Sequence, residues 1–235
     1  MKNIIVTGGT RGIGRAIVAR FLNDGFRVFT CGSSEESVRI LLSEFPGFTN
    51  TGHLIASKVD VSEKEQIFDW VKNIERISPS IEVLVNNAGI FFPGNIESEE
   101  EGVFEKTMAI NLASAYHCSR MVLPLLHKAE MAHIFNMCST ASIIGYPNGG
   151  SYCISKFGLL GMNKVLREEL KPTKIRVTAI LPGATFTDSW SASGLPSERF
   201  MKPEDVAEAV FSAWSMSPFC DVEEILLRPQ AGDIL

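Results

Sequence analysis

Two side chains in the second half of the sequence stand at a spacing that suits proton transfer. Tyr152 and Lys156 are four residues apart at the start of a predicted helix, so their side chains share a face. A tyrosine hydroxyl has a reference pKa of ~10, and a neighbouring ammonium group favours the phenolate and lowers that pKa. Ser139 lies thirteen residues upstream, just after a predicted strand, and offers a hydroxyl that can bind a carbonyl oxygen in front of Tyr152. Together the three residues indicate acid–base chemistry on a carbonyl or an alcohol.

The same pair also has a plainer interpretation. An isolated Tyr-x-x-x-Lys usually marks a solvated helix face. Here the residues around it are small or apolar, namely Cys153, Ile154, Ser155, Phe157 and Gly158. We therefore predict a buried helix start, where a lysine needs a partner.

A glycine-rich turn, Thr-Gly-Gly-Thr-Arg-Gly-Ile-Gly over residues 7–14, joins the first predicted strand to the first helix. Gly8, Gly12 and Gly14 remove Cβ atoms where the backbone turns and where a ligand must approach. The helix that follows presents unpaired N–H groups and the positive end of its dipole, which predicts a pyrophosphate site. The alternative is a tight strand–helix corner, since the spacing is not G-x-G-x-x-G. No G-K-[ST] follows, which argues against a P-loop nucleotide hydrolase.

Three further clusters follow predicted strands. Asp60-Val61 follows the third strand, Asn-Asn-Ala-Gly at 86–89 the fourth, and Pro182-Gly183 the sixth. Taken singly, each is a helix cap or a loop turn. Ligands of open α/β sheets bind along the carboxyl edge of the strands, so four clusters at that edge favour a shared binding site.

The elements that must position these residues alternate along the chain. Apolar runs predict strands at 4–6, 27–31, 53–59, 81–85, 133–137, 175–181 and 223–227. Helical patterns lie between them, at 13–24, 34–44, from a capping box at 62–65 onward, at 99–128 with a break near its start, at 152–170, and at 204–216. This order predicts an α/β fold: a Rossmann-like, doubly wound parallel sheet of about seven strands with helices on both faces. We see no linker or repeat, and expect one domain over 1–235.

Composition narrows the class of protein. The 235 residues are 45% hydrophobic and carry a net charge of −5, which favours a globular protein with no general attraction to nucleic acid or anionic lipid. The five cysteines include no C-x-x-C pair and predict free, mostly buried thiols in the cytoplasm, with no metal site. The longest uncharged run, 131–155, contains Pro147 and three glycines, so we expect no membrane helix.

With these motifs in order, the sequence resembles the short-chain dehydrogenase/reductase family over essentially its whole length. The motifs that carry the resemblance are residues 7–14, Asp60, residues 86–89, Asn111, Ser139, Tyr152 with Lys156, Pro182-Gly183 and Thr187.

The resemblance implies four catalytic residues, Asn111, Ser139, Tyr152 and Lys156. Tyr152 would transfer the proton and Ser139 would bind the substrate oxygen. Lys156 would hold the nicotinamide ribose and tune Tyr152, and Asn111 would position a water that links Lys156 to solvent.

The resemblance also implies a nicotinamide cofactor. The residues assigned to it are Gly8, Thr10, Arg11, Gly12, Ile13, Gly14, Ser33, Asp60, Val61, Asn87, Ala88, Gly89, Tyr152, Lys156, Pro182, Gly183, Thr185 and Thr187. Asp60 would meet the adenine, residues 87–89 the adenosine side, and Thr187 the carboxamide. Some positions depart from the family: Cys138 and Ser142 stand where Ser and Gly are frequent, and Thr178 where Asn is frequent.

The cofactor expected is NADP, with NAD the less favoured alternative. Strand two ends Thr-Cys-Gly-Ser-Ser over 30–34, and no carboxylate precedes Glu35 to hold the ribose 2′-hydroxyl of NAD. Arg11 in the glycine-rich turn can bind a 2′-phosphate, with help from Ser33 and Ser34. The alternative is that Arg11 is a surface residue.

We therefore predict an NADP-dependent oxidoreductase that interconverts a small-molecule carbonyl and an alcohol. The resemblance to the family allows a 3-oxoacyl thioester reductase or a broad carbonyl reductase. The alternative is a nucleotide-binding regulatory protein on the same fold without turnover. A sugar-nucleotide epimerase is disfavoured, because the chain lacks a sizeable C-terminal substrate domain.

Two expectations concern surfaces. The helices at 99–128 and 152–170 are apolar on several faces, which predicts a homotetramer or homodimer. Residues 187–200 are a candidate lid over the substrate, or else an ordinary connecting loop.

Overall fold

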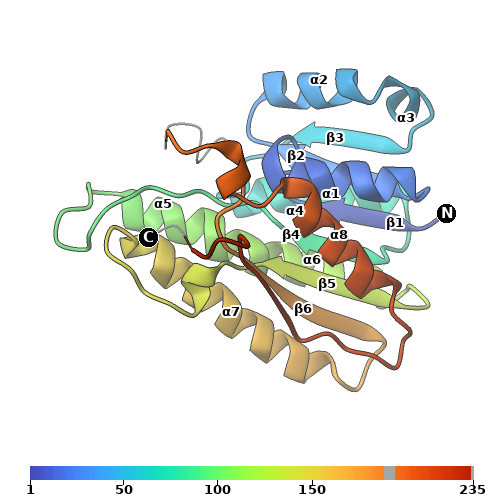
Figure 1. Cartoon of the computed structure of the whole chain (residues 1–235). Helices are drawn as coiled ribbons and strands as arrows, with labels where there is room; N and C mark the ends of the chain where they lie inside the picture. Colours follow the sequence, from blue (N-terminus) through green and yellow to red (C-terminus); the bar gives the residue numbers. More distant parts are fainter. Residues whose placement is uncertain (188–193, 234–235) are drawn as a thin grey trace.

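The computed structural model describes residues 1–187 and 194–233 and contains one parallel seven-stranded sheet (Figure 1). The strand order is β3-β2-β1-β4-β5-β6-β7, and every neighbouring pair is parallel. The strands are β1 (Asn3–Val6), β2 (Arg27–Gly32), β3 (Leu54–Lys58), β4 (Val83–Asn86), β5 (Ala132–Met137), β6 (Ile175–Pro182) and β7 (Glu224–Leu227). The order reverses between β1 and β4, the switch point at which open α/β sheets bind ligands.

Helices cover both faces of the sheet (Figure 1). The α-helices are α1 (Gly12–Asn23), α2 (Glu35–Glu44), α3 (Pro46–Asn50), α4 (Lys64–Ile77), α5 (Val103–Met108), α6 (Ser114–Leu126), α7 (Gly150–Leu170) and α8 (Pro203–Ser215). A π-helical segment (Ala109–Ala113) joins α5 to α6, and two 3-10 turns, Thr140–Ser142 and Ser197–Arg199, complete the described elements.

Alternation along the strands builds two cores. Ile4 and Val6 of β1 pack with α1, α2 and α8, whereas Ile5 between them packs with α4, α6 and α7. Both faces are apolar because both are covered, which is why the strands read as continuous hydrophobic runs. The predicted fold class is therefore confirmed.

Three details differ from the sequence expectations. The helix expected over 99–128 begins at Val103 and contains the π-helical turn. The capping box expected at 62–65 does not form, because the charged carboxylate of Asp60 binds the Ser62 hydroxyl and N–H instead, at 2.6 and 3.0 Å. The short helix α3, which starts at Pro46, was not expected. Residues 188–193 of the candidate lid over 187–200 lie outside the described residues.

Two findings bear on the environment of the chain. All five cysteines are free, and Cys31, Cys118, Cys138 and Cys153 are buried, as predicted. Within the described ranges, no helix has both the length and the apolar character needed to cross a membrane.

His133 gives the fold a pH-dependent element. Its ring is fully buried in β5 and stacks on Phe135. Thr178 donates its hydroxyl to the Val222 carbonyl at 2.5 Å, so its 2.7 Å contact with His133 Nε2 requires the ring N–H to donate. His133 Nδ1 has no partner among the described residues, and burial lowers the pKa of His133 well below its usual value. The ring is therefore neutral in the folded protein.

We expect stability to fall as the pH drops below about 6.5, the ordinary histidine pKa. Below that value the unfolded chain takes up a proton at His133 that the folded chain refuses, so the contribution is complete above pH ~6.5 and decreases toward the folded-state pKa. Urea unfolding between pH 5 and 8 measures the slope. His133→Phe, which cannot bind the proton, should show a shallower acid slope; an unchanged slope would contradict this origin.

Candidate active site

The first two turns of α7 carry Tyr152 and Lys156. Lys156 is 5% exposed, and its Nζ donates to the Met137 carbonyl at the end of β5 at 2.8 Å. The same Nζ lies 5.7 Å from the centre of the Tyr152 ring. The buried helix start expected from the sequence is confirmed, and the backbone of β5 supplies the lysine's partner.

Ser139 leaves β5 in extended conformation and begins the 3-10 turn Thr140–Ser142. Its Oγ accepts the Ala141 N–H at 3.1 Å, and Ser142 Oγ accepts the Ser139 N–H at 3.2 Å. This reciprocal cap holds Ser139 in place. Ser142, noted above only as a departure from the family, therefore fixes the serine, and the Ser-x-x-Ser spacing was the available signal.

The protonation states differ from the sequence expectation. Burial raises the pKa of Tyr152, and a hydrogen bond from Ser139 opposes the rise without cancelling it. Burial also lowers the pKa of Lys156 to about 8. The predicted lowering of the Tyr152 pKa is therefore wrong here, because desolvation outweighs the Ser139 hydrogen bond. At neutral pH Tyr152 is a phenol, a proton donor.

Asn111 lies in the π-helical segment between α5 and α6. Its Oδ1 accepts the Ile90 N–H at 2.8 Å, and its Nδ2 donates to the Ile90 carbonyl at 2.9 Å and to Ser155 Oγ at 3.0 Å. The side chain thus ties the segment after β4 to α7. A Cβ on Gly89 would lie 3.5 Å from Asn111 Oδ1 and 3.6 Å from Lys156 Nζ, so all three residues meet. The water-positioning role of Asn111 stays a prediction.

The glycine-rich turn is tightly packed, and it leaves the N-terminus of α1 uncapped by any side chain. Gly8 and Gly12 have φ of +65° and +53°, which favour glycine. A Cβ on Gly14 would lie 2.3 Å from the Gly8 carbonyl oxygen and 2.4 Å from Asn87 Nδ2. Ile13 is the second residue of α1. The N-terminus of this helix has no side-chain cap and no acidic residue in its first turn. Its N–H groups suit a phosphate, so the turn fits a dinucleotide.

Asn87 and Ala88 are tied to the glycine-rich turn by hydrogen bonds. Their N–H groups donate to Thr7 Oγ1 at 2.9 and 3.0 Å, and Asn87 Nδ2 donates to the carbonyls of Thr7 and Gly8. The Asn87 side chain therefore joins two loops. Thr7 received no individual role from the sequence, because its partners lie about 80 residues away.

The end of β2 lies beside the same turn. A Cβ on Gly32 would lie 2.5 Å from the Thr10 methyl group, so Thr10 packs over the strand end. Ser33 is exposed, and Ser34 caps α2 by accepting the Ser37 N–H at 3.2 Å. Arg11 is exposed at the N-cap position of α1.

The other assigned residues lie at the same sheet edge. Asp60 and Val61 follow β3, and two hydrogen bonds from Ser62 lower the Asp60 pKa. After β6, which ends at Pro182, Gly183 donates its N–H to Leu227 at 2.8 Å and Thr185 donates its hydroxyl to Gly183. The Thr187 methyl lies 3.2 Å from the Cβ position of Gly12, which brings the segment after β6 to the glycine-rich turn.

An aromatic side chain packs against Tyr152. Phe91 packs edge-on against its ring, with centroids 4.9 Å apart, and is 38% exposed. Other large exposed apolar residues follow the strands at this edge: Phe92, Ile143, Ile144, Phe186 and Leu195. The segments after β4 and after β5 lie side by side and bridge at Gly94 and Gly149 (Figure 1).

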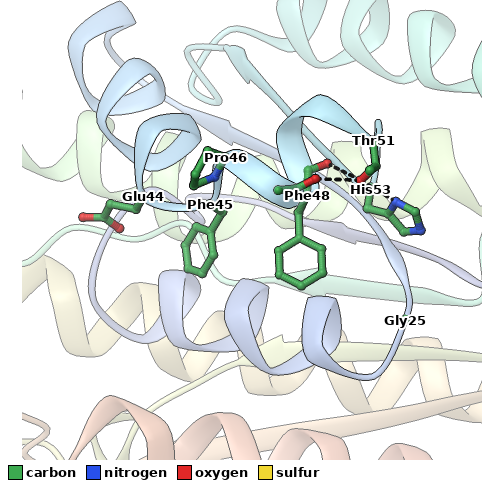
Figure 2. A pocket seen from close by; sticks show the side chains of 8 residues that line it. Gly25, Glu44, Phe45, Pro46, Phe48, Thr51 and His53 are labelled. Carbon is green, nitrogen blue, oxygen red and sulfur yellow. Dashed lines mark hydrogen bonds between the residues drawn. The ribbon is translucent and has the colours of Figure 1, made fainter.

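A hollow lies away from these residues. It measures about 450 Å³ and is lined by Phe45, Phe48, His53 and neighbouring residues between α2, α3 and the end of α1 (Figure 2). His53 precedes β3 and Gly25 precedes β2, so this hollow faces the amino edge of the strands. It is separate from the residues around Tyr152.

The chain matches the family model described as short chain dehydrogenase over residues 2–195. It is 31% identical over 229 residues to a 3alpha-hydroxysteroid dehydrogenase of Mediterraneibacter gnavus, covering 93% of this chain and 92% of the relative. It is 31% identical over 219 residues to a 3-oxoacyl-[acyl-carrier-protein] reductase of Thermotoga maritima, covering 89% and 88%.

Among solved structures, a metagenomic short-chain oxidoreductase in complex with NADP superposes with a TM-score of 0.83 at 26% identity, covering 97% of each chain. The family match spans both the glycine-rich turn and the Tyr152–Lys156 pair. The chain is an oxidoreductase of the short-chain dehydrogenase/reductase family.

Proposed function

We propose that the protein is an NADP-dependent carbonyl reductase in which Tyr152 donates the proton. The proposal rests on one observation: Ser139, Tyr152 and Lys156 lie together at the carboxyl edge of the sheet. Gly89 lies beside Lys156, and its neighbour Ala88 is hydrogen-bonded to Thr7 at the start of the glycine-rich turn. The family and an NADP-bound structural relative support it.

Several features of this chain suit a nicotinamide dinucleotide. The uncapped N-terminus of α1 would hold the pyrophosphate, and Lys156 would bind the nicotinamide ribose. Gly89 leaves space beside Lys156 that a larger side chain would narrow. The bound cofactor would supply a hydride to the carbonyl carbon of the substrate.

The protein's own groups would handle the oxygen and the proton. Ser139, held by its cap on Ser142, would donate a hydrogen bond to the carbonyl oxygen. Tyr152, a phenol at neutral pH, would deliver its proton to the same oxygen as charge develops there. The Lys156 ammonium would then stabilise the resulting phenolate.

The surroundings of Tyr152 favour an apolar, uncharged substrate. Phe91 packs against Tyr152, and the exposed apolar residues that follow the strands add hydrophobic surface at the same sheet edge. Lys106 stands over the Phe92 ring at 5.7 Å, and the adjoining segment 97–101 carries four glutamates. The excess of negative charge disfavours polyanionic substrates.

A matched pair of thioesters tests this substrate class. We expect a 3-oxoacyl group on uncharged N-acetylcysteamine to have a kcat/KM at least about tenfold above the same group on anionic coenzyme A. Added salt should narrow the gap, because it screens the glutamates. A carbonyl library with NADPH then locates the best neutral substrate. Preference for the coenzyme A ester at low salt would overturn the assignment.

We also propose that the protein acts in the cytoplasm as a homo-oligomer. Residues of α6 and α7 expose hydrophobic surface, with Tyr116, Ile154, Phe157 and Val165 each 41–58% exposed. Packing of these helices against a second copy would cover that surface. Light scattering at micromolar concentration should give at least twice the 25.8 kDa chain mass; a monomer mass would exclude it.

A further inference from the structure

The helix that carries Tyr152 and Lys156 lacks a cap of its own. Helix α7 starts at Gly150, and its N-cap residue, Gly149, has no side chain to bind the free N–H groups. Such orphan groups require partners from elsewhere when they lie inside a protein. Ser151, the residue before Tyr152, is only 1% exposed.

The missing cap comes from a segment about 50 residues earlier. Glu99 Oε1 accepts the Ser151 N–H at 2.8 Å, and its Oε2 accepts the Ser151 hydroxyl. A carboxylate at this position also suits the positive end of the helix dipole. Glu99 thus binds the residue next to Tyr152 through both oxygens.

The rest of the capping segment, residues 94–99, docks on the same turn. Gly94 donates its N–H to the Asn148 carbonyl at 3.0 Å, and Asn95 Oδ1 accepts the Asn148 N–H at 2.8 Å. Asn148 has φ of +61°, a left-handed conformation that costs energy and needs support. The segment therefore holds the chain in the conformation that starts α7.

The capping segment and the start of α7 lie too close together for side chains at Gly94 and Gly150. A Cβ on Gly150 would lie 2.2 Å from Glu99 Oε1 and 2.7 Å from the Gly94 carbonyl oxygen. A Cβ on Gly94 would lie 2.8 Å from Glu99 Cγ. The two segments can approach this closely only because both positions are glycine.

We propose that Glu99 is a positioning residue for the proton donor: by capping α7 at Ser151, it fixes the orientation of Tyr152 toward the substrate oxygen. The inference rests on the proposed function for the role of Tyr152. The Glu99 carboxylate makes its described hydrogen bonds to Ser151, at the start of the helix and not among the reacting groups.

The expected result separates positioning from general stability. Glu99→Ala should lower kcat for carbonyl reduction about 10–100-fold, the scale of a small misplacement at a reacting centre. The dissociation constant for NADPH should stay within about twofold, because the capping segment docks by hydrogen bonds on Asn148 and Ser151 at the start of α7. Glu99→Gln should recover kcat to within about threefold, since its amide can accept from the Ser151 N–H and donate to its hydroxyl.

Two matched controls sharpen the test. Glu100→Ala removes a neighbouring exposed carboxylate and should leave kcat for a neutral ketone unchanged, because the charge of segment 97–101 acts only on anionic substrates. Gly150→Ala should reproduce the loss of kcat, whereas Gly47→Ala, in the short helix α3 with nothing within 4 Å of its Cβ position, should keep kcat. If Glu99→Ala fails to fold, the kcat values of Glu99→Gln and of the two glycine variants still test the positioning role.

Amide hydrogen exchange distinguishes the two ways of failing. Exchange at Ser151 and Tyr152 should accelerate in Glu99→Ala and stay slow in Glu100→Ala, whether or not a substrate is known. A wild-type protein that reduces no carbonyl would refute the proposed function alone. An active wild type with equal kcat in Glu99→Ala and Glu100→Ala, or unchanged exchange at the helix start, would refute the positioning role.

Discussion

Replacing Tyr152 by phenylalanine should lower kcat for carbonyl reduction by about 10²–10⁴-fold, the usual contribution of a positioned acid. The change removes the oxygen that carries the proton, while the ring keeps its edge-on contact with Phe91 at 4.9 Å. Fold and cofactor affinity should therefore persist. Initial rates of NADPH oxidation give kcat, and thermal unfolding with cofactor titration checks the rest.

Tyr116→Phe is the matched control, since this tyrosine lies 46% exposed on α6. It should retain the wild-type rate. A Tyr152→Phe protein that reduces the same substrate at nearly the wild-type rate would remove Tyr152 from the mechanism.

Arg11→Ala should abolish most of a preference for NADPH over NADH. Arg11 occupies the N-cap position of α1, beside Thr10, which packs over the end of β2. That strand end carries no carboxylate to bind a ribose 2′-hydroxyl, and exposed Ser33 follows it. A charged hydrogen bond to the 2′-phosphate is worth about 1.5–3 kcal/mol, so wild-type protein should prefer NADPH about ten- to a hundredfold.

Dissociation constants for both cofactors measure the effect. In Arg11→Ala, NADPH affinity should fall while NADH affinity stays constant. Arg20→Ala removes the same charge from the last turn of α1, where Arg20 pairs with Glu208 at 2.7 Å, and should leave the preference intact. Equal or tighter binding of NADH by the wild type would contradict NADP as the cofactor.

The fold was predictable because its signals are local. Apolar runs such as Ile4–Val6 and the helical pattern from Ile13 depend on residues that neighbour one another in sequence. The break at Ala109–Ala113 was less predictable, because a π-helical turn forms where Asn111 reaches Ile90 and Ser155. Those partners lie on other elements, so tertiary contacts override the local preference.

The candidate site divides in the same way. The sequence indicated Ser139, Tyr152 and Lys156 by residue type and spacing, and the structure brings them together. The sequence-based prediction of a lowered Tyr152 pKa was wrong, because the burial that raises this pKa depends on the whole fold. It gave no sign of Glu99, whose partner Ser151 is 52 residues away.

Isotope transfer tests the central claim most directly. Wild-type protein is given NADPH with both nicotinamide C4 hydrogens replaced by deuterium, together with the best neutral ketone from the library. We predict one deuterium on the carbinol carbon of the product alcohol, one alcohol per NADPH oxidised, and loss of product formation in Tyr152→Phe. Tight NADPH binding without deuterated alcohol from any carbonyl compound would contradict the account and identify a nucleotide-binding protein without turnover.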